Sequence, residues 1–192
     1  VSLLRKRPRS PNGKVVDYRR SLVQQFFEQM LNDRFDEITR RADAKFLGAG
    51  MFGEGLSKDV EAEALGANVV DGGITAGLTA VALEAKRARE FGFAPGEFDR
   101  VKKAMTAYYE RAYNERDKSE SGSFAGEYVT HFLEGEPAPG IEYEFKLVQQ
   151  LLPGITVEEV TALGKTLLGE DSRVILATSP EKPGIKVPAE EE

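Results

Sequence analysis

The chain has 192 residues, of which 41% are hydrophobic and 30% are charged, as expected for a globular domain with one core. It has no cysteine and a formal net charge of −6, which excludes disulfides and thiol catalysis and disfavours general binding of polyanions. The basic run Arg5–Arg9 lacks interleaved aromatic residues, so we expect no nucleic-acid partner. No apolar run approaches the roughly 20 residues of a membrane span.

The first part of the chain predicts a strand, a helix and two further strands. Ser2–Arg7 reads as a strand that ends at Pro8, and Asp17 is predicted to be the N-cap of a long amphipathic helix. The apolar residues of this helix recur at the spacing of one face: Tyr18, Leu22, Val23, Phe26, Phe27, Met30, Leu31, Phe35 and Ile38. The glycine-rich segment Lys45–Phe52 and the segment Asp59–Val70 then predict two strands, the second antiparallel to the first.

The remainder is predicted to be mainly helical and to close with a strand. The expected helices are Ile74–Phe91, Pro95–Tyr113, Phe124–Leu133, Phe145–Leu152 and Thr156–Leu167, and the expected strand is Arg173–Thr178. This order predicts an α+β fold, a largely antiparallel mixed sheet with a layer of helices on one face. We expect three parts: an N-terminal strand and turn that form a truncated domain start (1–16), a single α/β domain (17–179) and a C-terminal linker or tail (180–192).

The most suggestive candidate site is the sequence His-Phe-Leu-Glu-Gly that begins at His131, the only histidine of the chain. It matches the inverted zinc motif H-x-x-E-H except that Gly135 replaces the last ligand. A zinc site normally needs three protein ligands, and Glu134 supplies only one more. The apolar neighbours of His131 predict that its side chain is partly buried. We therefore predict no catalytic residue, no metal ligand and no cofactor in this chain.

Three further groups of residues offer weaker candidates. Glu61 and Glu63 share one face of a predicted strand, and we expect that face to be solvated. Tyr108, Tyr109 and Tyr113 could form a binding stripe, but core packing with exposed hydroxyls fits their spacing better. Lys118 lies in a polar stretch, which predicts a solvated side chain and no nucleophile.

Several phrases of the sequence are similar to one known family. They are Asp17–Leu22, Met30–Arg34, Phe91–Phe93, Tyr113–Ser119, Phe132–Pro137 and Gly140–Glu144. Together they resemble the pitrilysin/insulinase family of zinc metallopeptidases, in particular its large bacterial members. The resemblance implies repeated α/β domains paired into a chamber, one of which carries the zinc motif near the N-terminus. It also implies zinc in that domain of the parent protein, a peptide or protein substrate and a periplasmic location.

In the same family, one C-terminal domain supplies an arginine and, seven residues later, a tyrosine that reach the substrate. The matching positions here hold Thr39 and Phe46, which have neither the charge nor the hydroxyl for that role. No catalytic residue is therefore carried over. Substrate-binding residues are unknown from the sequence, and the glycine-rich strand around Gly48 and Gly50 is the single suggestion.

The resemblance implies a non-catalytic domain of a zinc metalloendopeptidase that forms part of the substrate chamber and packs against the zinc-bearing domain. On this interpretation, the partners are other domains of the same polypeptide and the chain alone is inactive. The alternative is a stand-alone scaffold or protein-interaction module without peptidase activity. A complete H-x-x-E-H about two hundred residues upstream in the parent sequence would favour the peptidase.

Overall fold

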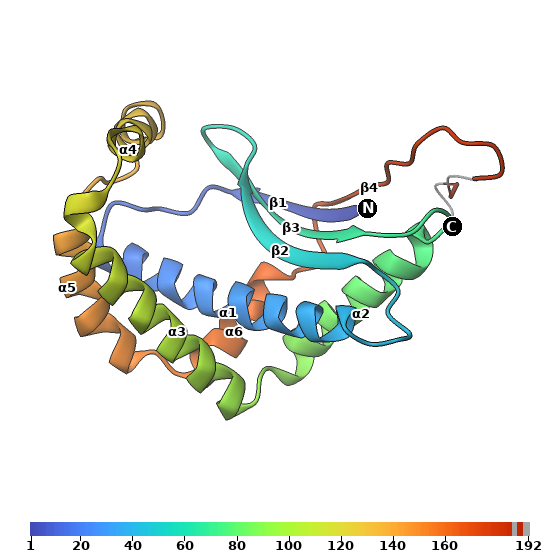
Figure 1. Ribbon diagram of the computed structural model, residues 1–192, viewed down its shortest axis with the longest axis horizontal. Coiled ribbons are helices and arrows are strands. Elements are labelled where there is room, and N and C mark those ends of the chain that lie inside the picture. Colours follow the sequence, from blue (N-terminus) through green and yellow to red (C-terminus); the bar gives the residue numbers. More distant parts are fainter. Residues whose placement is uncertain (186–187, 190–192) are drawn as a thin grey trace.

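A four-stranded sheet lies against one layer of helices in the computed structural model, which describes residues 1–185, 188 and 189 (Figure 1). The strands lie in the order β2-β3-β1-β4, and every described pairing is antiparallel. Their bounds are Ser2–Pro8 (β1), Gly48–Gly55 (β2), Val60–Asn68 (β3) and Arg173–Leu176 (β4). The predicted α+β class is confirmed.

The first strand lies inside the sheet, where β3 pairs with one of its edges and β4 with the other. Alternate residues of the sheet point to opposite faces. Met51 and Leu65 face the helices and belong to the core. On the outer face the residues of β3 are small, and the ring of Phe52 lies over Gly66, within 3.4 Å of the point where a Cβ would stand. Figure 1 shows no helix over this outer face in the described part of the chain.

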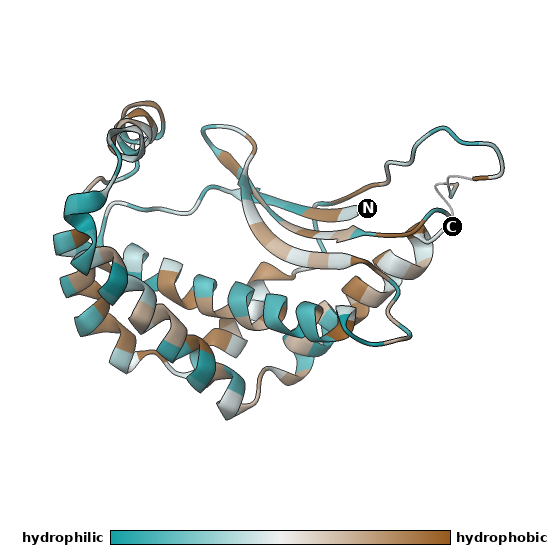
Figure 2. Cartoon of the chain, in the orientation of Figure 1, coloured by the Kyte–Doolittle hydropathy of each residue, from teal (hydrophilic) through white to brown (hydrophobic). Residues whose placement is uncertain are grey.

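Helix α1 (Val15–Thr39) carries the centre of the core, and Figure 2 shows its hydrophobic residues recurring along the helix. Seven of its apolar side chains are buried: Leu22, Val23, Phe26, Phe27, Met30, Leu31 and Phe35. The prediction that Asp17 is the N-cap was wrong. Lys14 is the N-cap, and Asp17 lies at the third helical position, where its carboxylate accepts a 2.9 Å hydrogen bond from the Lys14 N–H. A carboxylate at the third helical position can also accept from a free amide at the start of a helix. The helix therefore begins about one turn before the position that was predicted from Asp17.

Five further α-helices follow α1 in the described part of the chain. They are α2 (Ile74–Phe91), α3 (Pro95–Asn114), α4 (Ser121–Glu134), α5 (Ile141–Leu151) and α6 (Val157–Leu167), with short 3₁₀ turns at Arg116–Lys118 and Leu152–Gly154. Helix α6 approaches α1 very closely at Gly164, where an added Cβ would stand 2.1 Å from the ring of Phe27. Glycine at this position is what allows the two helices to pack.

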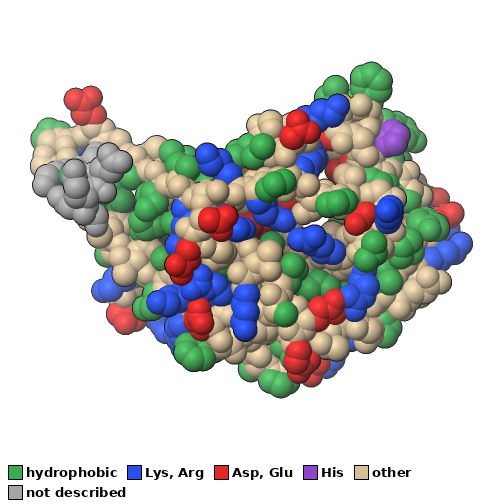
Figure 3. Space-filling view, turned by 180° about the vertical axis from the view of Figure 1, so that it is seen from behind, with side chains coloured by type: hydrophobic (Ala, Val, Ile, Leu, Met, Phe, Trp, Pro, Cys, Tyr) green, Lys and Arg blue, Asp and Glu red, His purple; other side chains and the backbone are tan. Residues whose placement is uncertain are grey.

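Helix α4 differs from the others because none of its residues is buried. It stands apart from the helix layer in Figure 1, and Figure 3 shows hydrophobic side chains at the surface of this end of the molecule. An ion pair between Arg9 and Glu134 connects its C-terminal end to the segment after β1. Its large apolar side chains are exposed: Phe124 (44%), Tyr128 (62%), Val129 (55%), Phe132 (86%) and Leu133 (63%). The helix was predicted correctly, but no other described element covers its apolar stripe.

Strand β2 begins three residues later than the predicted strand Lys45–Phe52 and extends to Gly55. The side chain of Phe46 instead enters the core, where its ring packs edge-on against Phe35 at 6.1 Å. At the free edge of β2, the Asn32 side chain of α1 bonds both backbone groups of Met51, at 3.0 Å to the carbonyl oxygen and 2.6 Å from the N–H. Part of this edge is therefore closed by a side chain.

Candidate functional site

A hollow of the described structure lies between the β2–β3 hairpin and the N-terminal half of α1. Its volume is about 680 Å³. The segment after β1 closes one side, and tyrosines from α1, α3 and α5 line another, namely Tyr18, Tyr109 and Tyr143. We call it the hairpin cavity. It is lined by more acidic than basic residues, and it contains the most heavily buried ion pair of the described chain.

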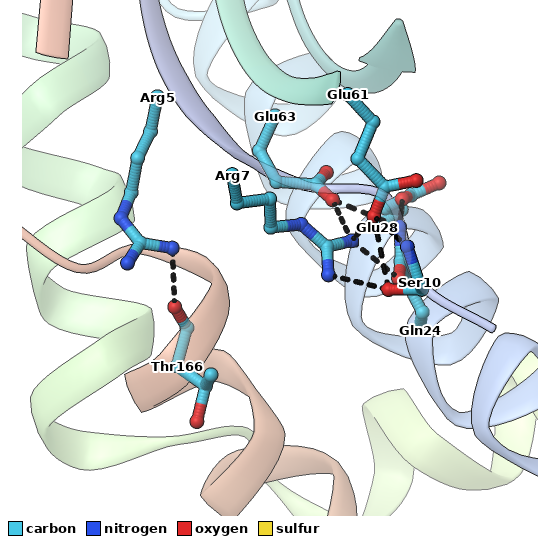
Figure 4. Close-up of polar contacts among 8 residues, drawn as sticks. All are labelled: Arg5, Arg7, Ser10, Gln24, Glu28, Glu61, Glu63 and Thr166. Carbon is cyan, nitrogen blue, oxygen red and sulfur yellow. Dashed lines mark hydrogen bonds and ion pairs between the residues drawn. The ribbon is translucent and has the colours of Figure 1, made fainter. Parts of the chain in front are cut away.

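That ion pair joins Arg7 of β1 to Glu63 of β3, with 2.6 Å between Nη2 and the carboxylate (Figure 4). The side chains of Arg7 and Glu63 are only 11% and 2% exposed. The same guanidinium lies 2.9 Å from the carboxylate of Glu61 and donates hydrogen bonds to Ser10 and Gln24. The Arg7 guanidinium therefore connects β1 to β3, to α1 and to the segment that joins β1 to α1. Breaking a pair buried to this degree leaves an uncompensated charge.

Gln24 extends the network from the sheet to α1. Its amide nitrogen donates to Glu63 at 3.1 Å and to Glu28, one helical turn later, at 2.8 Å. Burial raises the pKa of Glu28, and the nearby negative charge of Glu63 adds to this effect. Glu144 of α5 also lines the cavity, and burial followed by the charges of neighbouring glutamates raises its pKa as well.

Three buried polar atoms of this region make no hydrogen bond to a described residue: Arg7 Nε, Glu63 Oε2 and the Tyr18 hydroxyl. Burial is also the main cause of the raised pKa of the Tyr18 phenol. Buried polar atoms are normally paired, so three unpaired ones in one region are unusual. Perturbed acids and unpaired polar atoms around a cavity are typical of a binding site.

The expectation of a solvated face at Glu61 and Glu63 was wrong, because Glu63 is 3% exposed and paired. A signal was present in the sequence. Arg5 and Arg7 alternate on β1 as Glu61 and Glu63 do on β3, and the register places Arg5 opposite Glu63 and Arg7 opposite Glu61. Opposite charges at alternate positions of two antiparallel strands indicate cross-strand pairing. Arg5 itself reaches the other way and donates to the Thr166 carbonyl at 2.8 Å (Figure 4).

The broken zinc motif lies on the exposed helix α4. The predicted partial burial of His131 was wrong: the side chain is exposed, and its Nδ1 lies 2.6 Å from the Glu136 carbonyl oxygen. Glu134 pairs with Arg9, and Gly135 ends the helix in the left-handed conformation. Among the described residues, no three His, Cys, Asp or Glu side chains form a group that could hold a metal ion.

The other residues that the sequence analysis considered are packed in the core or exposed to solvent, and most of them support the fold. Tyr109 is buried and Tyr113 stacks on Phe145 at 4.8 Å, as core packing predicts, whereas Tyr108 is 57% exposed. Lys118 is exposed, in agreement with the prediction. The other candidates support the fold: the Thr39 hydroxyl donates to its own helix at the Phe35 carbonyl, and Phe46 is in the core.

The two glycines of β2 that the sequence suggested as substrate-binding residues, Gly48 and Gly50, do not line the hairpin cavity. No described residue lies within 4 Å of the point where a Cβ of Gly48 would stand, and Gly50 faces the Asn32 side chain. The glycines of β2 that line the hairpin cavity are Gly53 and Gly55, farther along the strand, and Gly13 lines it from the segment after β1. No helix in the described part of the chain is long and apolar enough to cross a membrane.

No family model matches the chain. It is 33% identical over 181 residues to a zinc protease PQQL-like protein of Arabidopsis thaliana, which covers 94% of this chain. The chain spans only 16% of the length of that relative, so the match concerns one part of a much longer protein.

Solved structures show the same fold. The first half of the periplasmic protease PqqL from Escherichia coli superposes with a TM-score of 0.81 and 16% identity, over 90% of this chain and 37% of that one. A predicted insulinase family protease from Yersinia pestis gives a TM-score of 0.78 and 19% identity, over 95% and 41% of the two chains.

A third structure matches from end to end. It is the inactive peptidase domain of a candidate zinc protease from Bordetella parapertussis, with a TM-score of 0.58 and 12% identity, over 96% of both chains. At such identities the structures show the fold, and the 33% match to the Arabidopsis protein adds relationship by sequence. The chain is therefore a domain of the pitrilysin/insulinase family of zinc metallopeptidases.

Proposed function

We propose that this chain is a non-catalytic domain of a zinc metalloendopeptidase, that it forms part of the wall of a substrate chamber, and that it packs against the zinc-bearing domain. The observation that carries the proposal is the uncovered apolar stripe of α4. The similarity to an inactive peptidase domain over 96% of this chain supports it.

The stripe of α4 is difficult to explain for a domain that works alone. Its five large apolar side chains are between 44% and 86% exposed on one helix of 14 residues. A helix of that length is marginal in water unless its apolar face is packed. Exposed apolar patches of this kind mark interaction surfaces. A second uncovered apolar surface lies on the outer face of the sheet at Phe52 (48%), Val174 (37%) and Leu176 (51%).

The occupant that fits best is another domain of the same polypeptide. The Arabidopsis relative is about six times as long as the matched region, so such a protein has further domains available. Burying the α4 stripe against one of them would stabilise the helix by roughly 25 cal/mol for each Å² of apolar surface removed from water. The zinc and the catalytic acid would then belong to the neighbouring domain, because His131 and Glu134 here are directed to Glu136 and Arg9. The periplasmic description of the PqqL relative supports the same compartment for this protein.

The test uses the full-length protein that contains this chain. Phe132→Ser should lower peptidase activity and increase amide exchange in α4, because it removes a central apolar contact with the neighbouring domain. Phe91→Ser is the matched control, since Phe91 is 85% exposed and Phe132 is 86% exposed, but Phe91 ends α2 in another part of the molecule.

A second arm uses the purified chain alone. We expect no peptidase activity and no stoichiometric zinc. Hydrolysis of a peptide that disappears with His131→Ala would overturn the non-catalytic assignment. Equal behaviour of Phe132→Ser and Phe91→Ser would overturn the packing role and favour a stand-alone scaffold.

A further inference from the structure

We propose that the hairpin cavity binds the positively charged end of an arginine or lysine side chain presented by a polypeptide segment. This inference is independent of the packing role proposed above, because it concerns a cavity formed wholly by this chain and is tested on this chain.

The charge balance of the cavity favours a cation. Three carboxylates, those of Glu28, Glu61 and Glu63, lie in one hydrogen-bonded network that contains a single guanidinium, that of Arg7. No other Arg or Lys within the described residues forms an ion pair with any of the three. The network therefore contains two more carboxyl groups than cations. Placing several carboxylates together raises the free energy of the ionised state, and a bound cation relieves that repulsion.

An unpaired buried atom points to a missing partner as well. Glu63 is 3% exposed, and its Oε1 accepts from Arg7 and Gln24 while its Oε2 accepts from no described residue. In Figure 4 the carboxyl groups of Glu61 and Glu63 point to the same side as Glu28 and Gln24 of α1, the side on which the cavity lies. A donor that enters the cavity would complete a network that is only partly satisfied.

The strand beside these carboxylates leaves them accessible. The residues opposite Glu63 and Glu61 on β2 are Gly53 and Gly55, neither of which has a side chain. A Cβ at Gly53 would have its nearest neighbour, Gln24, at 3.9 Å, and one at Gly55 would have no described residue within 4 Å. The glycines therefore leave an open slot at the edge strand. A long, thin side chain such as arginine or lysine fits such a slot.

The remaining walls suit a cation with an apolar stem. Tyr18, Tyr109 and Tyr143 line the cavity, and aromatic faces attract guanidinium and ammonium groups. Of the four basic residues that line the cavity, Arg7 and Arg9 form ion pairs with glutamates, whereas Lys14 and Arg20 form none with a described residue. Seven acidic residues line the same cavity, so negative charge still predominates. An anionic ligand would instead meet Glu28 and Glu144, both of which line the cavity.

The experiment measures binding of two pentapeptides to the purified chain by NMR titration. One is acetyl-Gly-Gly-Arg-Gly-Gly-amide, and the other replaces arginine with citrulline, which has the same shape and no charge. We expect the arginine peptide to bind about tenfold more tightly, as a charge-assisted hydrogen bond implies. Glu28→Gln should remove most of that difference. Glu110→Gln, which removes an exposed carboxylate from α3, is the control for the overall charge of −6.

A second variant separates the site from general electrostatic attraction. Gly53→Val fills the slot while the Cβ finds ordinary space, so the fold should persist and binding of the arginine peptide should fall about tenfold or more. The proposal is overturned if the citrulline peptide binds as tightly as the arginine peptide. It is equally overturned if Glu28→Gln and Glu110→Gln have the same effect, or if Gly53→Val folds and binds like the native chain.

Discussion

Replacing Gly164 by alanine tests the contact between α6 and α1 more directly than any other single substitution. In an exposed helix interior, alanine is favoured over glycine by about 1 kcal/mol. At Gly164 the added Cβ would stand 2.1 Å from Phe27 Cε2 and 2.8 Å from Cδ2 and Cζ. The ring cannot retreat freely, since Phe27 is 0% exposed and packs edge-on against Phe93 at 5.3 Å.

Overpacking of a filled core typically costs about 1–3 kcal/mol, and a displacement of more than 1 Å of a buried ring belongs at the upper end of that range. After the gain in helix propensity is subtracted, we expect Gly164→Ala to lower the free energy of unfolding by about 2 kcal/mol. In a chain of this size that corresponds to a fall in Tm of about 4–8 °C.

The measurement is urea and thermal unfolding followed by circular dichroism. Gly126→Ala is the matched control, because it is the same substitution in the interior of α4 with nothing within 4 Å of the new Cβ. It should be neutral or stabilise by up to about 1 kcal/mol. A Gly164→Ala chain as stable as the native one would refute the close packing of α6 on α1.

Two further predictions concern the hairpin cavity. Arg7→Met should lower the free energy of unfolding by about 3–5 kcal/mol, because it leaves the buried Glu63 without its cation, whereas Arg20→Met, at an exposed position of α1, should change it by less than about 0.5 kcal/mol. The raised pKa of Glu28 means that the folded chain holds this proton more strongly than the unfolded chain. Its ionisation therefore lowers stability as pH rises from the ordinary carboxyl range through the folded pKa, and Glu28→Gln should flatten that part of the pH profile of Tm. An unchanged profile, or an Arg7→Met chain as stable as Arg20→Met, would contradict the network described above.

Local pattern predicted most of the secondary structure. The periodicity of α1 was sufficient to identify both the helix and its buried face, since seven of its nine predicted apolar residues are buried. Predicted ends were less accurate where two signals compete: Asp17 caps from inside the helix, and the core position of Phe46 shifts β2 toward the C-terminus.

The burial of side chains was harder to predict than the secondary structure. Helix α4 has an apolar stripe like that of α1, yet its Phe132 is exposed. Such a stripe indicates that the helix face packs against something, but it does not show what the partner is. Glu63 shows the opposite error. The sequence pattern predicts that its carboxylate is exposed to solvent, whereas its pairing with Arg7 holds it in the interior. The candidate site depends on three segments distant in sequence, and only the alternation of charges on β1 and β3 indicated their meeting.

The amide of Asn32 has a consequence for how copies of this chain behave toward one another. By occupying the N–H and carbonyl of Met51, it acts as a one-residue substitute for a neighbouring strand. A sheet whose edge strand has unpaired backbone groups can add a strand of another molecule there and aggregate. Growth at this point of β2 would first have to displace a side chain anchored on α1, so Asn32 hinders self-association along this part of the sheet.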